Sequence, residues 1–144
     1  MVRAGQERLA GQVGKSEEAV VLGADTAVVV DGEIFGKPAD AADGERMVRR
    51  IAGRRHAVLT GVSLRLEDRE LRGVESTLVD VMPLSDADVA WYCGSGEGAD
   101  KAGAYAIQGL ASRFITRIDG SYANVVGLPV AMVFDLIRRL ASAG

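Results

Sequence analysis

The sequence contains a single cysteine, Cys93, and a single histidine, His56. One cysteine cannot form a disulfide within the chain, nor a metal site built from several thiolates. Cys93 is therefore expected to pack as a small apolar side chain, and the scarcity of cysteine predicts a cytoplasmic location. No cysteine or second histidine stands near His56 in the sequence, so we expect a packed or exposed histidine there and not a metal ligand.

The chain also lacks an apolar run of the roughly 20 residues that a membrane-spanning helix needs. Residues 1–15 lack the long apolar centre of a secretory signal. Positive charge is not in excess either, because the formal net charge is −3. Nucleic-acid-binding proteins usually present a basic face, so we expect no nucleic-acid partner and no membrane partner. A few lysines or arginines gathered in one cleft can still bind phosphate on an acidic protein.

The length and composition suit one domain with one core. The chain has 144 residues, of which 48% are hydrophobic. No internal repeat and no low-complexity linker divides it. We therefore predict a single domain across residues 1–144.

Strand and helix signals alternate in the first third of the chain. Residues 19–23 and 26–31 are predicted to be strands, and the turn pair Asp31-Gly32 joins the second of them to a short strand at 33–35. Asp40 can cap a helix that runs to about residue 52. Ahead of these elements, residues 1–15 carry apolar side chains at a spacing that suits a modest helix.

The remaining chain predicts a second hairpin and two further helices. Strands are expected at 56–66 and 71–82, and Ser85 with Asp88 has the spacing of a capping box. A glycine-rich loop follows at 94–109, and then a strand at 113–118. Pro129 is expected to begin a final helix, whose apolar stripe comprises Val130, Val133, Phe134, Ile137 and Leu140. Hairpins beside crossovers predict an α/β domain with a mixed, twisted β-sheet flanked by helices.

The first group of candidate site residues is Gly23-Ala24-Asp25-Thr26 with Gly36-Lys37-Pro38. Asp25 lies between two predicted strands, at a strand end where loops can converge on a ligand. Its carboxylate can accept a proton from water or hold a divalent metal, and Lys37 can meet a phosphate as a point charge. The alternative interpretation is that Asp25 caps a turn and that Gly36-Lys37-Pro38 only ends a hairpin.

The second group is Asp100-Lys101-Ala102-Gly103-Ala104-Tyr105-Ala106-Ile107-Gln108-Gly109. The Gln108 amide can donate and accept hydrogen bonds at a nucleobase edge, and Lys101 can neutralise a triphosphate. The alternative is an ordinary glycine loop with Tyr105 and Ile107 packed inward.

A third run, residues 120–129, can form a helix entry and a pocket wall, and we expect it to be structural. Trp91 and Tyr92 are interpreted as core or subunit-contact residues. The arginines between positions 46 and 55 are interpreted as a solvated helix face.

Together, and in this order, these runs resemble the Maf family. The motifs that carry the resemblance are Gly23-Ala24-Asp25-Thr26, Gly36-Lys37-Pro38, His56 with Thr60-Gly61-Val62, Asp100-Lys101-Ala102-Gly103-Ala104-Tyr105 with Ile107-Gln108-Gly109, and Val125-Val126-Gly127-Leu128-Pro129. Each motif is weak alone, but the ordered set is specific and spans nearly the whole chain.

The resemblance implies an architecture like that of inosine triphosphatases. It also implies hydrolysis of a nucleoside triphosphate to the monophosphate and pyrophosphate with a divalent cation, Mg²⁺ or Mn²⁺. It implies that Asp25 accepts the proton of the attacking water, that Lys37 and Lys101 bind phosphate, and that Thr26 and Gln108 select the base. The metal ligands are left open, with Asp25 as a candidate. Ala104-Tyr105 with Ile107-Gln108-Gly109 looks like the branch that acts on dTTP and UTP, although Ala106 stands where glycine is common.

The sequence differs from the family pattern in the residues before Gly23. Family members open with a strand and a loop of the type Ser-x-Ser-Pro-Arg-Arg, then a helix and an acidic residue, and nothing of this type precedes Gly23. The resemblance therefore predicts a domain that lacks the first strand-loop-helix and turns over slowly. A fragment, a misassigned start and a natural short paralogue all fit this expectation.

Three functions stay open at this stage. The first is a nucleoside triphosphate pyrophosphatase that clears the nucleotide pool, with activity impaired by the absent phosphate loop. The second is a non-catalytic nucleotide-binding protein. The third is an interaction protein, since the family is associated with septum formation and cell division. A homodimer is expected from the resemblance alone.

Overall fold

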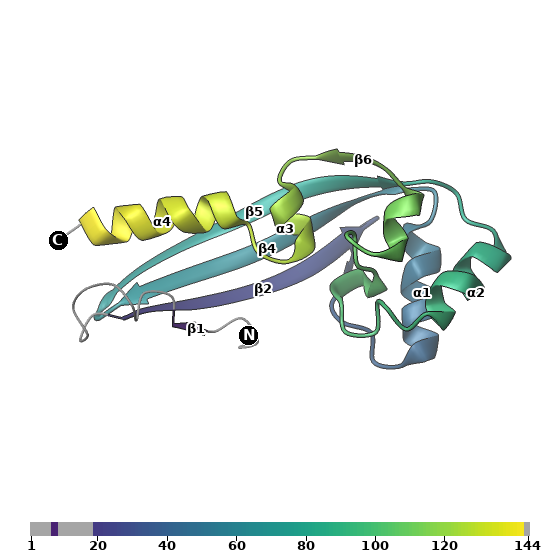
Figure 1. The fold of residues 1–144 in the computed structure, drawn as a ribbon, viewed down its shortest axis with the longest axis horizontal. Coiled ribbons are helices and arrows are strands. Elements are labelled where there is room, and N and C mark those ends of the chain that lie inside the picture. The colour runs from purple at the N-terminus through teal and green to yellow at the C-terminus, as the bar shows by residue number, and fades with distance from the viewer. Residues whose placement is uncertain (1–6, 9–18, 143–144) are drawn as a thin grey trace.

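The computed structural model describes residues 7–8 and 19–142. Its strands are β1 (Glu7–Arg8), β2 (Val20–Val30), β3 (Glu33–Phe35), β4 (Arg55–Leu66), β5 (Arg69–Val81) and β6 (Ile115–Asp119). Its α-helices are α1 (Ala41–Ile51), α2 (Asp86–Gly94), α3 (Tyr122–Val126) and α4 (Val130–Ser142), and its 3₁₀ helices are η1 (Ala102–Ala104) and η2 (Leu110–Phe114). Long curved strands run the length of the molecule, with α4 at one end and α1 and α2 at the other (Figure 1).

The sheet is ordered β1-β2-β4-β5-β6, and β3 pairs with β2. The predicted α/β class is confirmed, but every strand pair among the described residues is antiparallel, whereas we expected a mixed sheet. The reason is visible in Figure 1: β3 and α1 both lie at the end of the sheet where β2 finishes, so β4 begins there and runs back. A parallel neighbour would need a connection that returns the chain to the opposite end.

Strand β2 is continuous, which corrects the prediction of two strands with Asp25 at a strand end. Its ladder with β4 runs without interruption from Val20↔Leu66 to Val29↔Ala57, and Asp25 pairs with Gly61 in the middle of it. Gly23, Ala24 and Asp25 have low intrinsic strand preference, which suggested a break. The pairing with a long neighbouring strand overrides that preference.

The caps predicted from the sequence are confirmed. The Asp40 side chain accepts a hydrogen bond from the Asp43 backbone N–H at the start of α1. Ser85 and Asp88 form a reciprocal capping box at the start of α2. The turn at Asp31 and Gly32, where both residues have positive φ, joins β2 to β3 as expected.

The last part of the chain departs from prediction in two places. Val133, Leu136 and Leu140 form the buried face of α4, whereas Val130 and Phe134 are each 57% exposed, so the predicted stripe is rotated about the helix axis. The rotation arises because α4 packs along β4 and β5 with one narrow face. Strand β6 begins at Ile115, because residues 110–114 form η2.

Most of the helix expected over residues 1–15 lies outside the described residues. At Glu7–Arg8 the expectation is wrong, because these two residues pair with Leu22 and Val21 at the edge of β2. In the part of the chain that is described, no helix combines the length and apolar character needed to cross a bilayer.

Two apolar clusters lie on the same face of the sheet. One packs around α1, α2 and the 3₁₀ segments, and it takes Val28 and Val58 from the central strands. The other packs under α4 and takes Leu22 and Leu64 from the same two strands. Side chains of a strand alternate between faces, so Thr26 and Thr60, at positions in between, also belong to this face. A polar pair thus separates the two clusters, and the candidate site is built there.

Candidate functional site

A cavity of about 650 Å³ opens beside the middle of β2. It is bordered by β2, by the loop between β3 and α1, by the loop that follows α2, and by the end of α3. All five site residues predicted from the sequence border this one cavity: Asp25, Thr26, Lys37, Lys101 and Gln108. Segments far apart in the sequence therefore converge at one place, with a volume in the range of small-molecule sites.

Thr26 borders the cavity beside the apolar residues Leu22 and Ala24. Its Oγ1 lies 2.9 Å from Oγ1 of Thr60 on β4, so the two hydroxyls share a hydrogen bond. Thr60 is fully buried, and this bond fixes the Thr26 side chain against the sheet. A hydroxyl has more than one hydrogen-bonding position, so Thr26 can still bond to a ligand.

Asp25 is exposed and borders the same cavity. It neighbours Thr26 on an extended strand, so the two side chains point to opposite faces. Both residues border the cavity because, among the described residues, no strand pairs with the outer edge of β2 between residues 23 and 27. A carboxylate open to solvent at the border of a cavity can accept a proton from a water molecule.

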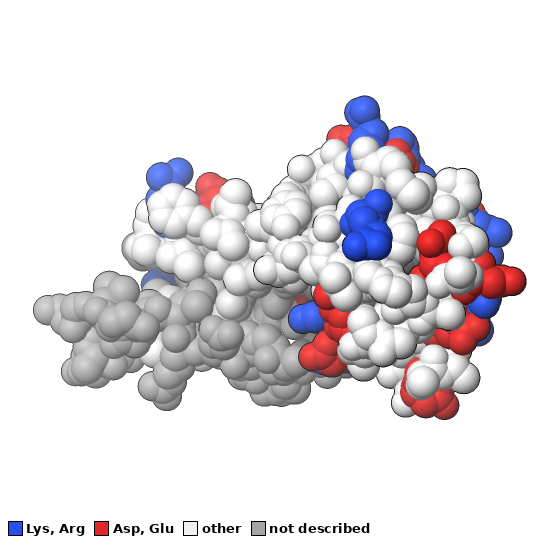
Figure 2. Space-filling model, turned by 45° about the vertical axis from the view of Figure 1, so that its right-hand side comes forward, with Lys and Arg blue, Asp and Glu red and all other residues white. Residues whose placement is uncertain are grey.

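Lys37 and Lys101 are both exposed and reach the cavity from different loops. Among the described residues every ion pair uses an arginine, so neither lysine is neutralised there by a carboxylate. Elsewhere, Figure 2 shows basic and acidic side chains interspersed over the lobe that carries α1 and α2. Two lysines at one cavity suit an anionic ligand.

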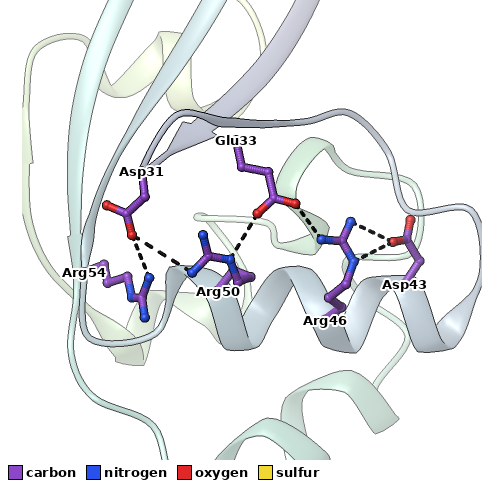
Figure 3. Close-up of polar contacts among 6 residues, drawn as sticks. All are labelled: Asp31, Glu33, Asp43, Arg46, Arg50 and Arg54. Atoms are coloured by element: carbon purple, nitrogen blue, oxygen red, sulfur yellow. Dashed lines mark hydrogen bonds and ion pairs between the residues drawn. The ribbon is translucent and has the colours of Figure 1, made fainter.

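The loop that carries Lys37 is tied down on both sides. Before it, Glu33 of β3 accepts a hydrogen bond from Arg46 of α1 at 2.7 Å. After it, the Ala39 backbone N–H donates to Asp43, which also pairs with Arg46 at 3.1 Å. Figure 3 shows Arg46 between these two carboxylates, and Arg50 and Arg54 continue the same row of ion pairs to Asp31. Of the arginines predicted to form a solvated helix face, Arg46, Arg50 and Arg54 therefore fasten the β2–β3 hairpin to α1 and the turn that follows it.

The carboxylates of Glu33 and Asp43 stay ionised. The hydrogen bond from Arg46, followed by that from Arg50, holds the pKa of Glu33 below its usual value. The backbone hydrogen bond from Ala39, followed by that from Arg46, lowers the pKa of Asp43. These groups are on the surface, so salt screens their ion pairs, and we interpret the row as a geometric restraint on the loop.

His56 is 1% exposed, so of the two expected alternatives, packed or exposed, the structure shows the packed one. Its Nε2 shares a hydrogen bond with the Tyr105 hydroxyl at 2.6 Å, and the two rings meet edge to face. Burial lowers the pKa of His56 to about 4 and raises that of Tyr105. Both groups are therefore neutral at pH 7, and the inward packing of Tyr105 and Ile107 is confirmed.

Sequence reasoning missed the function of Asn124, which anchors the segment that lines the cavity. Its side chain is fully buried, and its Nδ2 donates to Val58 O and Thr77 Oγ1, each at 3.0 Å. These bonds fasten α3 to β4 and β5, and the residues that follow, 125–128, line the cavity. The signal was a lone amide in an apolar stretch, which is where a buried polar anchor is found.

A divalent metal has a limited set of ligands here. Within residues 7–8 and 19–142, no group of three or more histidine, cysteine or acidic residues is arranged so that it could hold a metal ion. Two carboxylates, Asp25 and Asp100, border the cavity. Magnesium is commonly held by one or two carboxylates together with substrate phosphates and waters, so this donor set fits a cation that arrives with a phosphorylated ligand.

Comparison with known proteins points to one family. Residues 2–140 match the family described as Maf-like protein. A "dTTP/UTP pyrophosphatase" of Symbiobacterium thermophilum is 57% identical over 121 residues, which cover 84% of this chain and 62% of the relative. One of Anaeromyxobacter dehalogenans is 52% identical, covering 83% and 64%, and one of Geobacter metallireducens is 43% identical, covering 98% and 74%. The chain thus spans less than two thirds of the length of the first two relatives.

Proposed function

The chain belongs to the Maf family, and on that premise we propose that it acts as a nucleoside triphosphate pyrophosphatase on dTTP and UTP. The observation that carries the proposal is the convergence of the predicted acid, both predicted lysines and both predicted base-selecting residues on one cavity. The names of the relatives support the choice of reaction and of base. Products would be the nucleoside monophosphate and pyrophosphate.

Lys37 and Lys101 bind the triphosphate. They enter the cavity from two separate loops, so they can contact different phosphate groups of one ligand. Their charges weaken the repulsion between the phosphate oxygens and an approaching nucleophile. They also stabilise the charge that develops on pyrophosphate as it leaves.

Asp25 acts as the general base. It takes a proton from a water molecule, whose oxygen forms a bond to the α-phosphorus while the bond to the bridging oxygen breaks. The electron pair of that bond leaves with pyrophosphate. Asp25 is exposed, so bulk water can supply the nucleophile and remove the proton after turnover.

Thr26 and Gln108 select the base. The pyrimidine edge of thymine or uracil carries two carbonyl oxygens with an N–H between them, and an amide can both donate to and accept from such an edge. Thr26 is held by Thr60, and Gln108 borders the same cavity from the loop after Tyr105. Apolar residues also border the cavity and are expected to exclude water from the base.

A divalent cation, Mg²⁺ or Mn²⁺, belongs to the proposed reaction. Asp25 is the candidate to hold it together with phosphate oxygens of the substrate, and Asp100 borders the same cavity. When bound, the cation supplies positive charge that lowers the barrier to attack at phosphorus.

We further propose that residues 1–144 form one domain, that the protein is cytoplasmic, and that it forms a homodimer. One sheet joins all the described strands, which supports the single domain.

The proposal is tested by measuring pyrophosphate release from dTTP, UTP and GTP, with magnesium and with a chelator. We expect release from the two pyrimidine nucleotides that the chelator abolishes, and at least tenfold less from GTP. Glu45→Gln is the matched control for the substitution Asp25→Asn, because Glu45 is an exposed acid of α1 that pairs only with Arg49 among the described residues. Equal rates for all three nucleotides, or rates unaffected by the chelator, would contradict the proposal.

A further inference from the structure

The loop that carries Gln108 is fastened to two side chains outside it. The Tyr92 hydroxyl, on α2, accepts a hydrogen bond from the Ala106 backbone N–H at 3.0 Å. The same hydroxyl donates to Glu97 Oε2 at 2.9 Å. Tyr92 is 2% exposed within the apolar cluster around α1 and α2, so the hydroxyl is a fixed point in the molecule.

Glu97 fastens the other side of the same loop. Its Oε1 accepts from the Leu110 backbone N–H at 2.9 Å, and its Oε2 accepts from that of Ala111 at 3.4 Å. Together with Tyr92, it therefore bonds to the backbone just before Ile107-Gln108 and again just after it. Hydrogen bonds to a carboxylate are stronger than those between neutral groups.

The packing around Glu97 is close. A Cβ built on Gly109 would lie 2.1 Å from Glu97 Oε1, so Gly109 provides the space that the carboxylate occupies. On the adjacent side, a Cβ on Gly98 would lie 2.0 Å from the Ala104 carbonyl oxygen. The segment that bears Glu97 thus lies directly against the loop, with glycine at the two points of nearest approach.

From these contacts we infer that Tyr92 and Glu97 are the positioning residues of the base-selecting loop, and that they set the discrimination between pyrimidine and purine nucleotides. The inference rests on the proposed function, because it assumes that Gln108 reads a base. Neither side chain borders the cavity, so both act through the backbone of residues 106–111 and not by contact with the ligand.

The consequence for specificity follows from geometry. Gln108 is exposed and its side chain has no hydrogen bond to the described residues, so its position depends on its backbone. A displacement of about 1 Å in a group that positions the substrate can lower the reaction rate by up to about 100-fold. Glu97→Ala removes both backbone bonds and leaves the Tyr92 hydroxyl with one partner fewer. Glu97→Gln keeps one carbonyl oxygen as acceptor, and Tyr92→Phe keeps the ring but loses the hydroxyl.

The test compares the parent protein with Glu97→Ala, Glu97→Gln, Tyr92→Phe and the control Glu45→Ala. Three quantities are measured for each: amide hydrogen exchange of residues 105–111, the ratio of kcat/KM for UTP to that for GTP, and the affinity for inorganic triphosphate, which has no base. We expect Glu97→Ala and Tyr92→Phe to speed exchange in this segment and to lower the UTP-to-GTP ratio about tenfold. Glu97→Gln is expected to lie between them and the parent. Affinity for inorganic triphosphate should change less than twofold in every variant.

The outcomes separate the inference from the proposed function. If the parent protein hydrolyses neither UTP nor GTP, the proposed function and the specificity claim both fail. Amide hydrogen exchange would still decide whether Tyr92 and Glu97 hold the loop in place. A parent that prefers UTP, with variants that keep the same ratio, would overturn the inference alone. Loss of triphosphate affinity in parallel with loss of the ratio would indicate general structural damage and would also overturn it.

Discussion

His56 should make the stability of the protein sensitive to mild acid. The side chain is 1% exposed, and burial lowers its pKa from 6.5 to about 4 in the folded state. In the unfolded chain the imidazole is solvated and keeps a pKa near 6.5. The unfolded state therefore binds a proton between pH 6.5 and 4 that the folded state does not, and the free energy of unfolding falls with decreasing pH across that window.

The size of the effect follows from the two pKa values. Each pH unit inside the window costs about 1.4 kcal/mol, so lowering the pH from 7.5 to 5 should remove about 2 kcal/mol from the free energy of unfolding. Above pH 6.5 the histidine is neutral in both states and contributes no pH dependence. For a domain of this size, the loss corresponds to a fall of roughly 6 °C in melting temperature.

The assay is urea unfolding at pH 7.5 and pH 5 for the parent and for His56→Gln. Glutamine can hydrogen bond to the Tyr105 hydroxyl but does not titrate. Carboxylates also change their protonation over this range, but they do so in both proteins, so the difference between the two slopes isolates the histidine. Equal slopes for parent and variant, or a His56 titration near pH 6.5 in the NMR spectrum of the folded protein, would refute this reasoning.

Three further changes should have distinct effects. Asp25→Asn is expected to lower kcat about 10²–10⁴-fold while shifting the melting temperature little, because the side chain is an exposed candidate base; near-normal turnover would remove it from the mechanism. Gln108→Ala should alter base preference more than maximal rate, since a lost edge contact leaves a base atom unpaired; equal proportional losses for UTP and GTP would count against that role. Asn124→Ala should lower the free energy of unfolding by about 2–4 kcal/mol, measured by urea unfolding, because it removes the buried amide that donates to Val58 O and Thr77 Oγ1; a change below about 1 kcal/mol would show that water replaces the amide.

The parts of the fold that were predictable are those set by near neighbours in the sequence. The Asp40 cap, the Ser85 capping box and the Asp31-Gly32 turn each depend on residues within a few positions of one another. Local hydrogen bonding and backbone sterics decide such features, so a single sequence suffices to find them.

The errors arose where distant residues decide the outcome. The continuity of β2 through Asp25 depends on a ladder with β4, more than thirty positions away. The rotation of α4 depends on which of its faces meets β4 and β5. In both cases local preference was overridden by tertiary contact, which the pattern of one segment does not contain.

The candidate site shows the same division. The residues of the candidate site were predictable, because an acid, two lysines and an amide stand in recognisable motifs, and these residues do border one cavity. The residues that hold them in place were not readable. Tyr92, Glu97 and Asn124 act through backbone groups far along the chain, and nothing in their local sequence indicates which groups those are.

The central claim is hydrolysis of dTTP and UTP between the α- and β-phosphates. It is tested most directly by following UTP and magnesium with ³¹P NMR in the presence of the protein. We expect the three UTP signals to be replaced by those of UMP and pyrophosphate, and we expect Asp25→Asn to leave UTP unchanged over the same time. Formation of UDP and inorganic phosphate, or no loss of UTP with the parent protein, would contradict it.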